Sequence, residues 1–457
     1  MSIVILAAGQ GKRMKSDLPK VLQPLAGRPL LAHVLDTARA LEPASIQVVY
    51  GHGGEQVRAA LDAKDLTWVH QAEQLGTGHA VQQVLPGLTD ASIALVLYGD
   101  VPLIRHETLR ELVALAGPEI MSLLTVDLPD PTGYGRIVRD AGGRIVRIVE
   151  EKDASDTERA LREGNTGVMA VPVRWLRRWL SRLRNDNAQR EYYLTDIIAM
   201  AVADGVAVQP LKAEMPAEVL GVNDKRQLAE LESEYRRRSA EALFAAGVTL
   251  VDPARIDVRG RVTVGRDVFV DANVVFEGAV TLGDRVRIGP NCVLRDCTLA
   301  ADVLVNSHCV IEQATVGTHS IIGPFARLRP GAELASEVHI GNFVEVKNST
   351  LADGAKANHL AYVGDATVGA RVNIGAGTII ANYDGANKHR TIIGDDAHTG
   401  SNSVLVAPIT VGSGATVGAG STVTKDVPAG KLTVARAKQL TLEGWKRPVK
   451  NSKKREQ

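Results

Sequence analysis

A glycine-rich turn near the start of the chain carries residues suited to holding a phosphate. An apolar segment, residues 3–7, runs directly into Ala8-Gly9-Gln10-Gly11-Lys12-Arg13. Glycines after a strand let backbone N–H groups turn toward an anion, which favours phosphate binding. Arg13 and Lys20 could neutralise a triphosphate and stabilise charge that develops at a reacting phosphorus. By itself, the segment could equally be a solvated basic loop.

The residues after this turn exclude two common nucleotide-binding motifs. A dinucleotide fingerprint requires glycine at its third position, where this chain has Met14. A Walker A loop requires Ser or Thr after Gly-Lys, and the sequence lacks that spacing here. The turn is therefore expected to bind phosphate without belonging to either class.

A second set of candidate residues lies in the C-terminal half. Arg329, Lys347 and Tyr362 fall among short repeats that are otherwise plain, and such a cluster suggests an anionic, hydroxyl-rich ligand. His359 lies among them. A lone histidine is usually a surface residue, but a neutral imidazole is suited to accept a proton near pH 7. Residues 381–388 interrupt the repeats and are expected to project as a loop, a usual place for ligand contacts.

A six-residue repeat from Val264 to about Pro428 positions these C-terminal candidates. Each repeat opens with an aliphatic residue and has a small or β-branched residue four places on. One aliphatic residue per repeat cannot bury a core alone, but stacked coils bury a continuous column, so the pattern predicts a β-solenoid. The opening residues include Val264, Leu282, Ile288, Val316, Ile322, Ile340, Val368, Ile374, Ile393, Val411 and Val417.

This repeat resembles that of the hexapeptide-repeat proteins. The resemblance implies a left-handed parallel β-helix, whereas the general rule for parallel crossovers would give the right-handed form. It also implies a homotrimer with ligand sites in the grooves between prisms.

Alternating apolar and helical segments up to about residue 212 position the N-terminal candidates. This alternation favours a three-layer α/β domain with a mostly parallel, Rossmann-like sheet. Such sheets bind ligands at the carboxyl ends of their strands. Strands are expected at 3–7, 46–50, 68–71, 93–98 and 122–127, and helices at 29–41, 54–61, 78–85 and 106–116.

A linker helix is expected over 224–246, because Leu228, Leu231, Tyr235 and Leu243 recur at helical spacing and Gly247 follows. The fold class is therefore α/β with a C-terminal β-helix. The expected parts are a nucleotidyltransferase domain over 1–222, a linker helix over 223–247, and a β-helix domain over 248–457 with a disordered tail from about 446.

The composition limits the other functions this chain could have. Its 52 acidic and 53 basic residues nearly cancel, which argues against a dedicated nucleic-acid binder. The three cysteines lack the spacing of a zinc site or a disulfide framework, so small buried fillers in a reducing compartment are expected. No apolar run reaches membrane-spanning length, and the N-terminus lacks a basic signal-peptide region, so a cytoplasmic location is expected.

The N-terminal motifs together resemble the signature of sugar-nucleotide pyrophosphorylases. The phosphate turn with Pro19-Lys20 is followed, in order, by Gln74-Leu75-Gly76-Thr77-Gly78, Tyr98-Gly99-Asp100 and Asn165-Thr166-Gly167. The resemblance implies that UTP and N-acetylglucosamine 1-phosphate react to give UDP-N-acetylglucosamine and pyrophosphate, with Arg13 and Lys20 in catalysis. It assigns binding of these compounds to Leu6, Ala7, Ala8, Gly9, Lys20, Gln71, Gly76, Thr77, Tyr98, Gly99, Asp100, Gly135, Glu150, Asn165 and Asn223.

The same resemblance assigns Asp100 and Asn223 to Mg²⁺. Mg²⁺ is a hard ion that takes few protein oxygens and keeps waters and substrate phosphates for its other positions. One carboxylate and one amide oxygen are sufficient protein ligands for that arrangement.

The whole chain resembles a bacterial family of bifunctional enzymes that join such a half to a hexapeptide-repeat acetyltransferase half. The resemblance implies acetyl transfer from acetyl-CoA to glucosamine 1-phosphate, with His359 as general base. No cysteine stands at a matching position, which favours direct transfer over an acyl-enzyme. It assigns glucosamine 1-phosphate to Arg329, Lys347, Tyr362 and Asn373, and acetyl-CoA to Ala376, Asn382, Tyr383, Ser401, Ala419 and Arg436.

Two departures and two alternatives accompany this interpretation. Lys12 stands where the family often has Thr, and Ala435 where Ser is common; neither change removes a catalytic group. One alternative is a single-activity UTP–sugar pyrophosphorylase whose solenoid only oligomerises, and His359, Tyr383 and Arg436 argue against it. The other is a structural, surface-binding solenoid. That alternative would show rows of identical exposed residues, such as threonines, and would lack a phosphate loop; no such row is expected from the sequence, and the phosphate loop is present.

Overall fold

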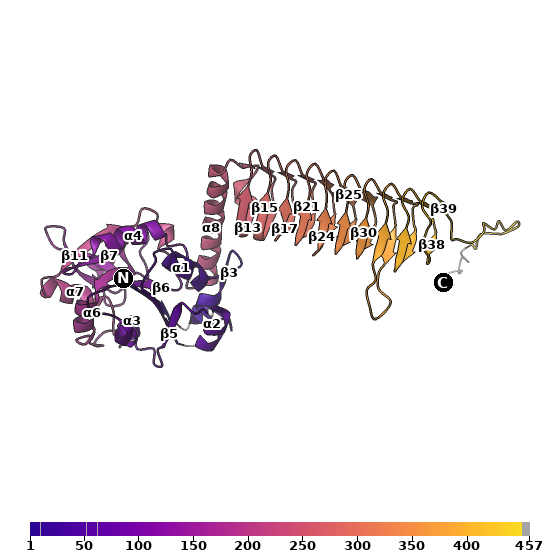
Figure 1. Cartoon of the computed structure of the whole chain (residues 1–457). Helices are drawn as coiled ribbons and strands as arrows, with labels where there is room; N and C mark the ends of the chain where they lie inside the picture. Colours follow the sequence, from indigo (N-terminus) through magenta and orange to yellow (C-terminus); the bar gives the residue numbers. More distant parts are fainter. Residues whose placement is uncertain (10, 52, 62, 450–457) are drawn as a thin grey trace, which may run out of the picture. The chain divides into compact units, whose positions relative to one another are not determined.

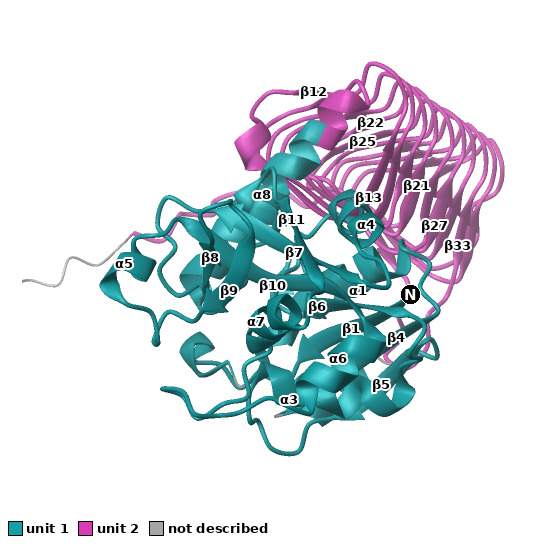
Figure 2. Ribbon diagram, turned by 90° about the vertical axis from the view of Figure 1, so that its left-hand side faces the viewer, with its two compact units in different colours: residues 1–241 teal, residues 242–457 magenta. Residues whose placement is uncertain are grey.

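The computed structural model describes residues 1–9, 11–51, 53–61 and 63–449 of the 457-residue chain. The chain divides into two compact units, Met1–Glu241 and Ala242–Gln457 (Figures 1 and 2). The predicted linker helix is present as α8, Lys225–Ala245. Gln10 of the phosphate turn and the predicted disordered tail from residue 450 onward lie outside the described residues.

Unit 1 is built on a mixed sheet of nine strands. The strands that flank β1 on both sides run parallel to it, as predicted. β10 runs antiparallel to both of its neighbours, which the sequence analysis did not foresee because strand direction has no local signature. In spatial order the strands are β11 (Ala207–Lys212), β7 (Ile120–Asp127), β10 (Glu163–Pro172), β6 (Ile93–Tyr98), β1 (Ser2–Ala7), β4 (Ser45–Tyr50) and β5 (Leu66–His70), with β8 (Arg136–Arg139) and β9 (Ile145–Val149) attached beside β10.

Helices cover both faces of this sheet, so its central strands are buried on both sides (Figure 2). In β1, Val4 and Leu6 belong to one apolar core, whereas Ile3 and Ile5 belong to the other. This explains why the strand is a continuous apolar run rather than an alternating one. The first core is completed by α3 (Thr77–Val84), α6 (Val173–Leu180) and α7 (Asp196–Ala203), and the second by α1 (Leu30–Arg39), α2 (Gly54–Leu61) and α4 (His106–Leu115). The short α5 (Asp156–Arg159) follows β9.

Unit 2 is a parallel β-helix, as the six-residue repeat predicts. Its strands form an 11-stranded sheet from β12 (Thr249–Leu250) to β39 (Leu432–Thr433) and a 17-stranded sheet from β13 (Ile256–Val264) to β38 (Thr422–Val423). The handedness of the coil stays a prediction from the resemblance. The aliphatic column is present and almost fully buried: Val270, Ile288, Val305, Ile322 and Ile340 are paired in register on successive coils.

The prediction that this surface carries no row of identical residues was wrong. Outward-facing threonines stand in register on successive coils, interrupted only by Glu333 and Ile392 within the paired strands. The sequence conceals this row, because the positions that pair on successive coils, Glu333 and Ile392 included, are 17 or 18 residues apart and once 25. The row comprises Thr263, Thr281, Thr298, Thr315, Thr350, Thr367 and Thr410.

Candidate functional site

A pocket of 470 Å³ opens at the carboxyl ends of β1 and β6 in unit 1. These strands are parallel neighbours, so Ala7 and Tyr98 end at the same edge of the sheet. The pocket collects most of the residues assigned to the nucleotide from sequence. The residues so assigned that line it are Leu6, Ala7, Ala8, Gly9, Lys20, Gln71, Gly76, Thr77, Tyr98 and Asp100.

Gly76 closes one side of this pocket in a conformation that only glycine adopts easily. Its φ is 108°, and a Cβ at this position would lie 2.7 Å from the carbonyl oxygen of Tyr192. The buried Gln71 donates from its amide nitrogen to the Gly76 carbonyl at 3.2 Å. The backbone of Gly76 is therefore held between the side-chain amide of Gln71 and the neighbouring segment 191–192. That segment brings Glu191 into the lining, a residue the sequence motifs did not single out.

Lys20 links the two residues assigned to Mg²⁺. Its ammonium group donates to Asp100 Oδ2 and, at 3.3 Å, to Asn223 Oδ1. Both oxygens therefore converge on one cationic point. Nowhere among the described residues do three or more His, Cys, Asp or Glu side chains gather around one point as a metal cluster would. The pair fits an ion that uses two protein oxygens, because a cation already occupies the position between them.

A second, smaller cavity of 220 Å³ adjoins the pocket through shared lining residues, Lys12 and Lys20. Its remaining lining residues are Gly11, Arg13 and Asn223. Arg13 is exposed there. The structure thus brings both predicted catalytic cations to one region, with Lys20 common to both cavities.

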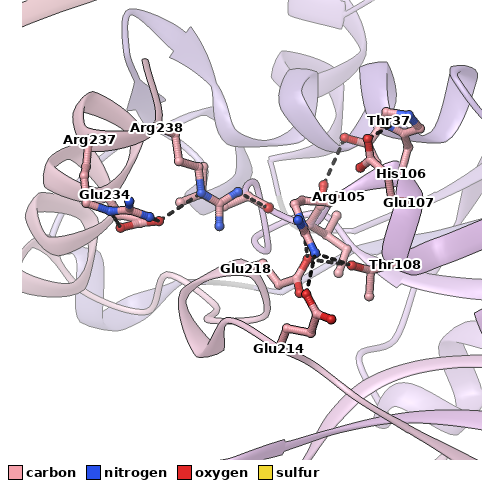
Figure 3. Close-up of polar contacts among 12 residues, drawn as sticks. Thr37, Arg105, His106, Glu107, Thr108, Glu214, Glu218, Glu234, Arg237 and Arg238 are labelled. Atoms are coloured by element: carbon pink, nitrogen blue, oxygen red, sulfur yellow. Dashed lines mark hydrogen bonds and ion pairs between the residues drawn. The ribbon is translucent and has the colours of Figure 1, made fainter. Parts of the chain in front are cut away.

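A buried polar cluster fixes the two chain segments that carry Asp100 and Asn223 (Figure 3). Glu218, fully buried, accepts from Arg105 Nε at 3.2 Å and from the Thr108 hydroxyl at 2.9 Å. Arg238 of α8 donates to the Leu103 carbonyl at 2.8 Å. These contacts join the segment after Asp100 to the segments on both sides of Asn223. The Val222 amide also donates directly to the Asp100 carbonyl at 3.0 Å.

Glu150 is not part of the pocket lining and is held by Thr195, whose hydroxyl donates to it at 2.9 Å. Burial raises the pKa of the Glu150 carboxyl, and the charges of Asp196 and Asp153 act in the same direction. The pKa of Tyr98 is also raised, first by burial and then by the charges of Glu150 and Asp100.

Three further assigned residues, Gly135, Asn165 and Gly99, lie outside the pocket lining. The backbone N–H of Asn165 donates to the Gly135 carbonyl at 2.8 Å. The side-chain oxygen of Asn165, Oδ1, accepts from the backbone N–H of Gly167 at 2.9 Å. Gly99 packs beneath the turn rather than in the pocket lining: its amide donates to the Leu6 carbonyl at 2.9 Å. Gly135 and Gly99 present no side chain to the site, and the side-chain carbonyl oxygen of Asn165 is used within its own segment.

In unit 2, three cations converge on one outward face of the solenoid. Arg329 Nη1 pairs with Glu345 Oε1 at 2.7 Å, and Lys347 stands one coil beyond Arg329. The pKa of Lys347 is lowered, first because its ammonium group lies against that of Lys388 and also by the Arg329 charge. Like charges held this close suit an anion between them. Lys388 belongs to the loop that interrupts the repeats, so no repeat position pointed to it.

Tyr362 lies beside this cation group, in register with Glu345 on the preceding coil. Its ring folds over Gly364, where a Cβ would lie 2.5 Å from the Tyr362 hydroxyl oxygen. The ring therefore lies along the same face as the cations. Asn373 is not brought to this face: it lies in β31 (Asn373–Ile374) of the other, 11-stranded sheet.

His359 occupies a corner column that it shares with three of the residues assigned to acetyl-CoA, Ala376, Ser401 and Ala419. Backbone bonds from Gly377 to His359, from Asn402 to Ala376 and from Gly420 to Ser401 repeat one pattern on successive coils. Arg436 Nη1 donates to the Ala419 carbonyl at 2.6 Å, which ties it to the end of this column. Residues in equivalent positions on successive coils are Asn342, His359, Ala376, Ser401 and Ala419.

The imidazole of His359 is exposed and oriented by Asn342, whose Oδ1 lies 3.0 Å from Nδ1. Because the partner atom is an amide oxygen, Nδ1 carries the hydrogen. Nε2 then keeps its lone pair and faces away from Asn342, which is the form that a proton acceptor requires.

Asn382 and Tyr383 begin the loop that interrupts the repeats. The loop closes on itself through Asp384, whose carboxylate accepts from the amides of Ala386 and Asn387 and from His389 Nε2 at 2.6 Å. The pKa of Asp384 is lowered by these bonds, the Asn387 amide first. Tyr383 itself is exposed and donates to the Gly385 carbonyl at 2.6 Å.

Fold and sites together define a chain with a nucleotidyltransferase-type unit and a hexapeptide-repeat unit. Models of known families match both: a MobA-like NTP transferase domain over residues 3–241, a GMPPB C-terminal domain over 258–342, and six bacterial transferase hexapeptides over 390–425. In the described part of the chain, no helix combines the length and apolar character needed to cross a membrane.

Relatives align with nearly the entire chain. A protein of Azoarcus sp. (strain BH72) named "Bifunctional protein GlmU" is 64% identical over 98% of this chain and 100% of the relative. Proteins of the same name from Ralstonia nicotianae and Cupriavidus pinatubonensis are 62% and 61% identical over 99% of this chain and 100% of each relative. The chain belongs to the GlmU family of bifunctional proteins.

Proposed function

We propose that this chain catalyses two successive reactions of UDP-N-acetylglucosamine synthesis. The solenoid acetylates glucosamine 1-phosphate with acetyl-CoA, and unit 1 then joins the product to UTP with release of pyrophosphate. The observation that carries the proposal is the presence of two chemically different constellations, one in each unit. Unit 1 has a glycine turn with Lys20, Asp100 and Asn223, and unit 2 has both an oriented imidazole and a separate group of cations.

In uridylyl transfer, the glycine turn holds the triphosphate, and Arg13 and Lys20 neutralise its charge. Asp100 and Asn223 would hold Mg²⁺ in the position that the Lys20 ammonium group takes between them, and the ion would stabilise charge at the α-phosphorus. A sugar-phosphate oxygen attacks that phosphorus in line, and pyrophosphate leaves. The phosphate oxygen is already nucleophilic at neutral pH, so these residues contribute positioning and charge neutralisation rather than a side-chain base.

In acetyl transfer, the cation group of Arg329, Lys347 and Lys388 binds the sugar phosphate. The neutral amine attacks the thioester carbonyl, His359 Nε2 accepts the proton, and CoA leaves as its thiol after protonation. The Nδ1–H held by Asn342 supports this role, because it keeps the free lone pair on Nε2. A backbone N–H near Ala376 is suited to stabilise the oxyanion.

The active assembly is a homotrimer whose acetyl-transfer sites lie between chains. Tyr362 and Lys347 lie on one sheet, whereas Asn373 lies on the other, so a neighbouring prism is suited to complete each site. An exposed apolar column beside His359 favours such an interface. It consists of Phe325 and Phe343, stacked at 5.4 Å, and Leu360, with 47–59% of each residue exposed.

The cytoplasm is the proposed location. Cys292, Cys297 and Cys309 are free and buried, as expected for a protein kept in a reducing compartment. Burial raises the pKa of the Cys297 thiol to about 12, so this thiol stays protonated and unreactive.

Substitution of His359 tests the assignment of two independent sites. In His359→Ala, acetyl transfer should fall by about 10²–10⁴-fold, the usual contribution of a general base. Pyrophosphate release from UTP, N-acetylglucosamine 1-phosphate and Mg²⁺ should stay unchanged. His398→Ala is the matched control, since His398 is exposed on the same 11-stranded sheet. A wild-type chain without acetyl transfer would leave only the single-activity alternative.

A further inference from the structure

One buried carboxylate in unit 2, Asp365, has no role in the reactions described above. It follows β29 (Tyr362–Gly364) at a corner of the coil, with 7% of the residue exposed. A buried carboxylate is costly unless its oxygens accept hydrogen bonds. Asp365 Oδ1 accepts from Asn348 Nδ2, and Asp365 Oδ2 accepts from Asn382 Nδ2. Both of its oxygens are thus used by amide groups, one on each side.

These three side chains stand at equivalent corners of three successive coils. Asn348 follows β26 (Glu345–Lys347), and Asn382 follows β32 (Ile379–Ala381). The backbone is tied in the same order, since the Asp365 amide donates to the Lys347 carbonyl at 3.0 Å. The ladder begins at Asn348, because the corner before it is Gly331. A Cβ on Gly331 would lie 3.2 Å from Asn348 Oδ1, so this oxygen faces away from Asp365.

The ladder joins the two halves of the acetyl-transfer site. Lys347, of the sugar-phosphate cation group, directly precedes Asn348, and Tyr383, assigned to acetyl-CoA, directly follows Asn382. Asp365 therefore stands between the coil that carries one substrate subsite and the coil that carries the other. Because each amide donates through Nδ2, the carboxylate also fixes which end of the Asn382 amide faces outward. An amide that could turn over would exchange a donor for an acceptor at that position.

We propose that Asp365 is a positioning residue for acetyl transfer, which holds the Lys347 coil and the Asn382–Tyr383 coil in the relative placement that the two substrates require. This inference rests on the proposed acetyltransferase function. Asp365 touches neither substrate; it acts through Asn348 and Asn382.

Exchange of donors and acceptors within the ladder tests this proposal. Asp365→Asn keeps the side-chain volume but leaves a single acceptor oxygen between two NH₂ groups, so one contact becomes donor against donor. Acetyl transfer should fall by roughly tenfold to a hundredfold, the scale of a small misplacement of reacting groups. The loss should appear in kcat and in the KM for acetyl-CoA. Uridylyl transfer by the same preparation should not change.

The reciprocal variant, Asn348→Asp with Asp365→Asn, restores the pattern. Asn at position 365 then donates to the new carboxylate and accepts from Asn382, with the net charge unchanged. We expect this double variant to recover acetyl transfer to within about threefold of wild type, well inside the loss expected from misplacement. A role of plain corner stability would not show this recovery together with an unchanged thermal midpoint.

The matched control is Asp353→Asn, another corner aspartate, whose Oδ1 accepts from the Ser336 amide at 2.9 Å. It should leave acetyl transfer unchanged. Wild-type activity in Asp365→Asn would overturn the inference, and so would a double variant as impaired as the single one. A wild-type chain without acetyl transfer would instead refute the proposed function, so the two failures are distinguishable.

Discussion

Substitution of Asp100 by asparagine removes one charge from the proposed metal pair and leaves its shape intact. The Asp100 side chain is 15% exposed, and that of its partner Lys20 is 14% exposed, so solvent screens this site only partly. Two unit charges about 4 Å apart interact by about 4 kcal/mol at an effective dielectric constant near 20. A factor of ten in rate corresponds to about 1.4 kcal/mol. With a discount for partial exposure, Asp100→Asn should therefore lower uridylyl transfer by about 10²–10³-fold.

The assay is pyrophosphate release from UTP and N-acetylglucosamine 1-phosphate across a titration of Mg²⁺. The variant should need more Mg²⁺ for half-maximal rate, while its acetyl transfer stays at the wild-type level. Asp90→Asn is the matched control: Asp90 forms an exposed ion pair with Arg177 at 2.9 Å, a kind of contact worth little. Near-wild-type activity of Asp100→Asn at every Mg²⁺ concentration would refute the role of this carboxylate.

Two further predictions concern pH and stability. Burial raises the pKa of Glu150, so its ionised form is lost at a higher pH than is usual for a glutamate. The KM for N-acetylglucosamine 1-phosphate should therefore rise as the pH falls through that raised pKa. Glu150→Gln should remove this component and leave only the titration of the substrate phosphate, and identical profiles would contradict the role of Glu150. Ile340 is fully buried in the aliphatic column, so Ile340→Ala should lower the free energy of unfolding by about 2–5 kcal/mol. Ile392→Ala, at 48% exposure, should cost far less in the same urea titration, and equal losses would refute the column as the core of the solenoid.

The solenoid core could be predicted because its signal is local and repeated. Each coil needs one aliphatic residue at one place. The regular spacing of Val270, Ile288 and their successors in the sequence therefore predicts that these residues stack on successive coils. The threonine row escaped the same reasoning. Its members depend on coil lengths of 17, 18 and 25 residues, which become aligned only when the coils are stacked.

In unit 1, the motifs located the strand ends but not what packs against them. The phosphate turn and Asp100 lie at the ends of parallel neighbours, as an α/β sheet requires. Glu191 and Thr195 come from a segment without a motif. They reach the site because the Gly78 amide donates to the Tyr192 carbonyl at 2.8 Å, a tertiary contact that no spacing encodes. Lys388 was not assigned individually, although the interrupting segment 381–388 that carries it was expected to make ligand contacts.

The two units obtain their candidate sites by different physical routes. The sheet of unit 1 gathers side chains from strand ends that are far apart in sequence, and it needs buried clusters such as that of Glu218 to hold them. The solenoid places equivalent residues about 4.8 Å apart on successive coils, so any two neighbours in a column can touch. The Asn342–His359 contact and the ladder through Asp365 follow from this spacing alone. A column of repeat residues becomes a candidate site when a few of its corner residues are polar. The candidate site of unit 2 therefore consists of repeat positions and one added loop, without further helices or strands.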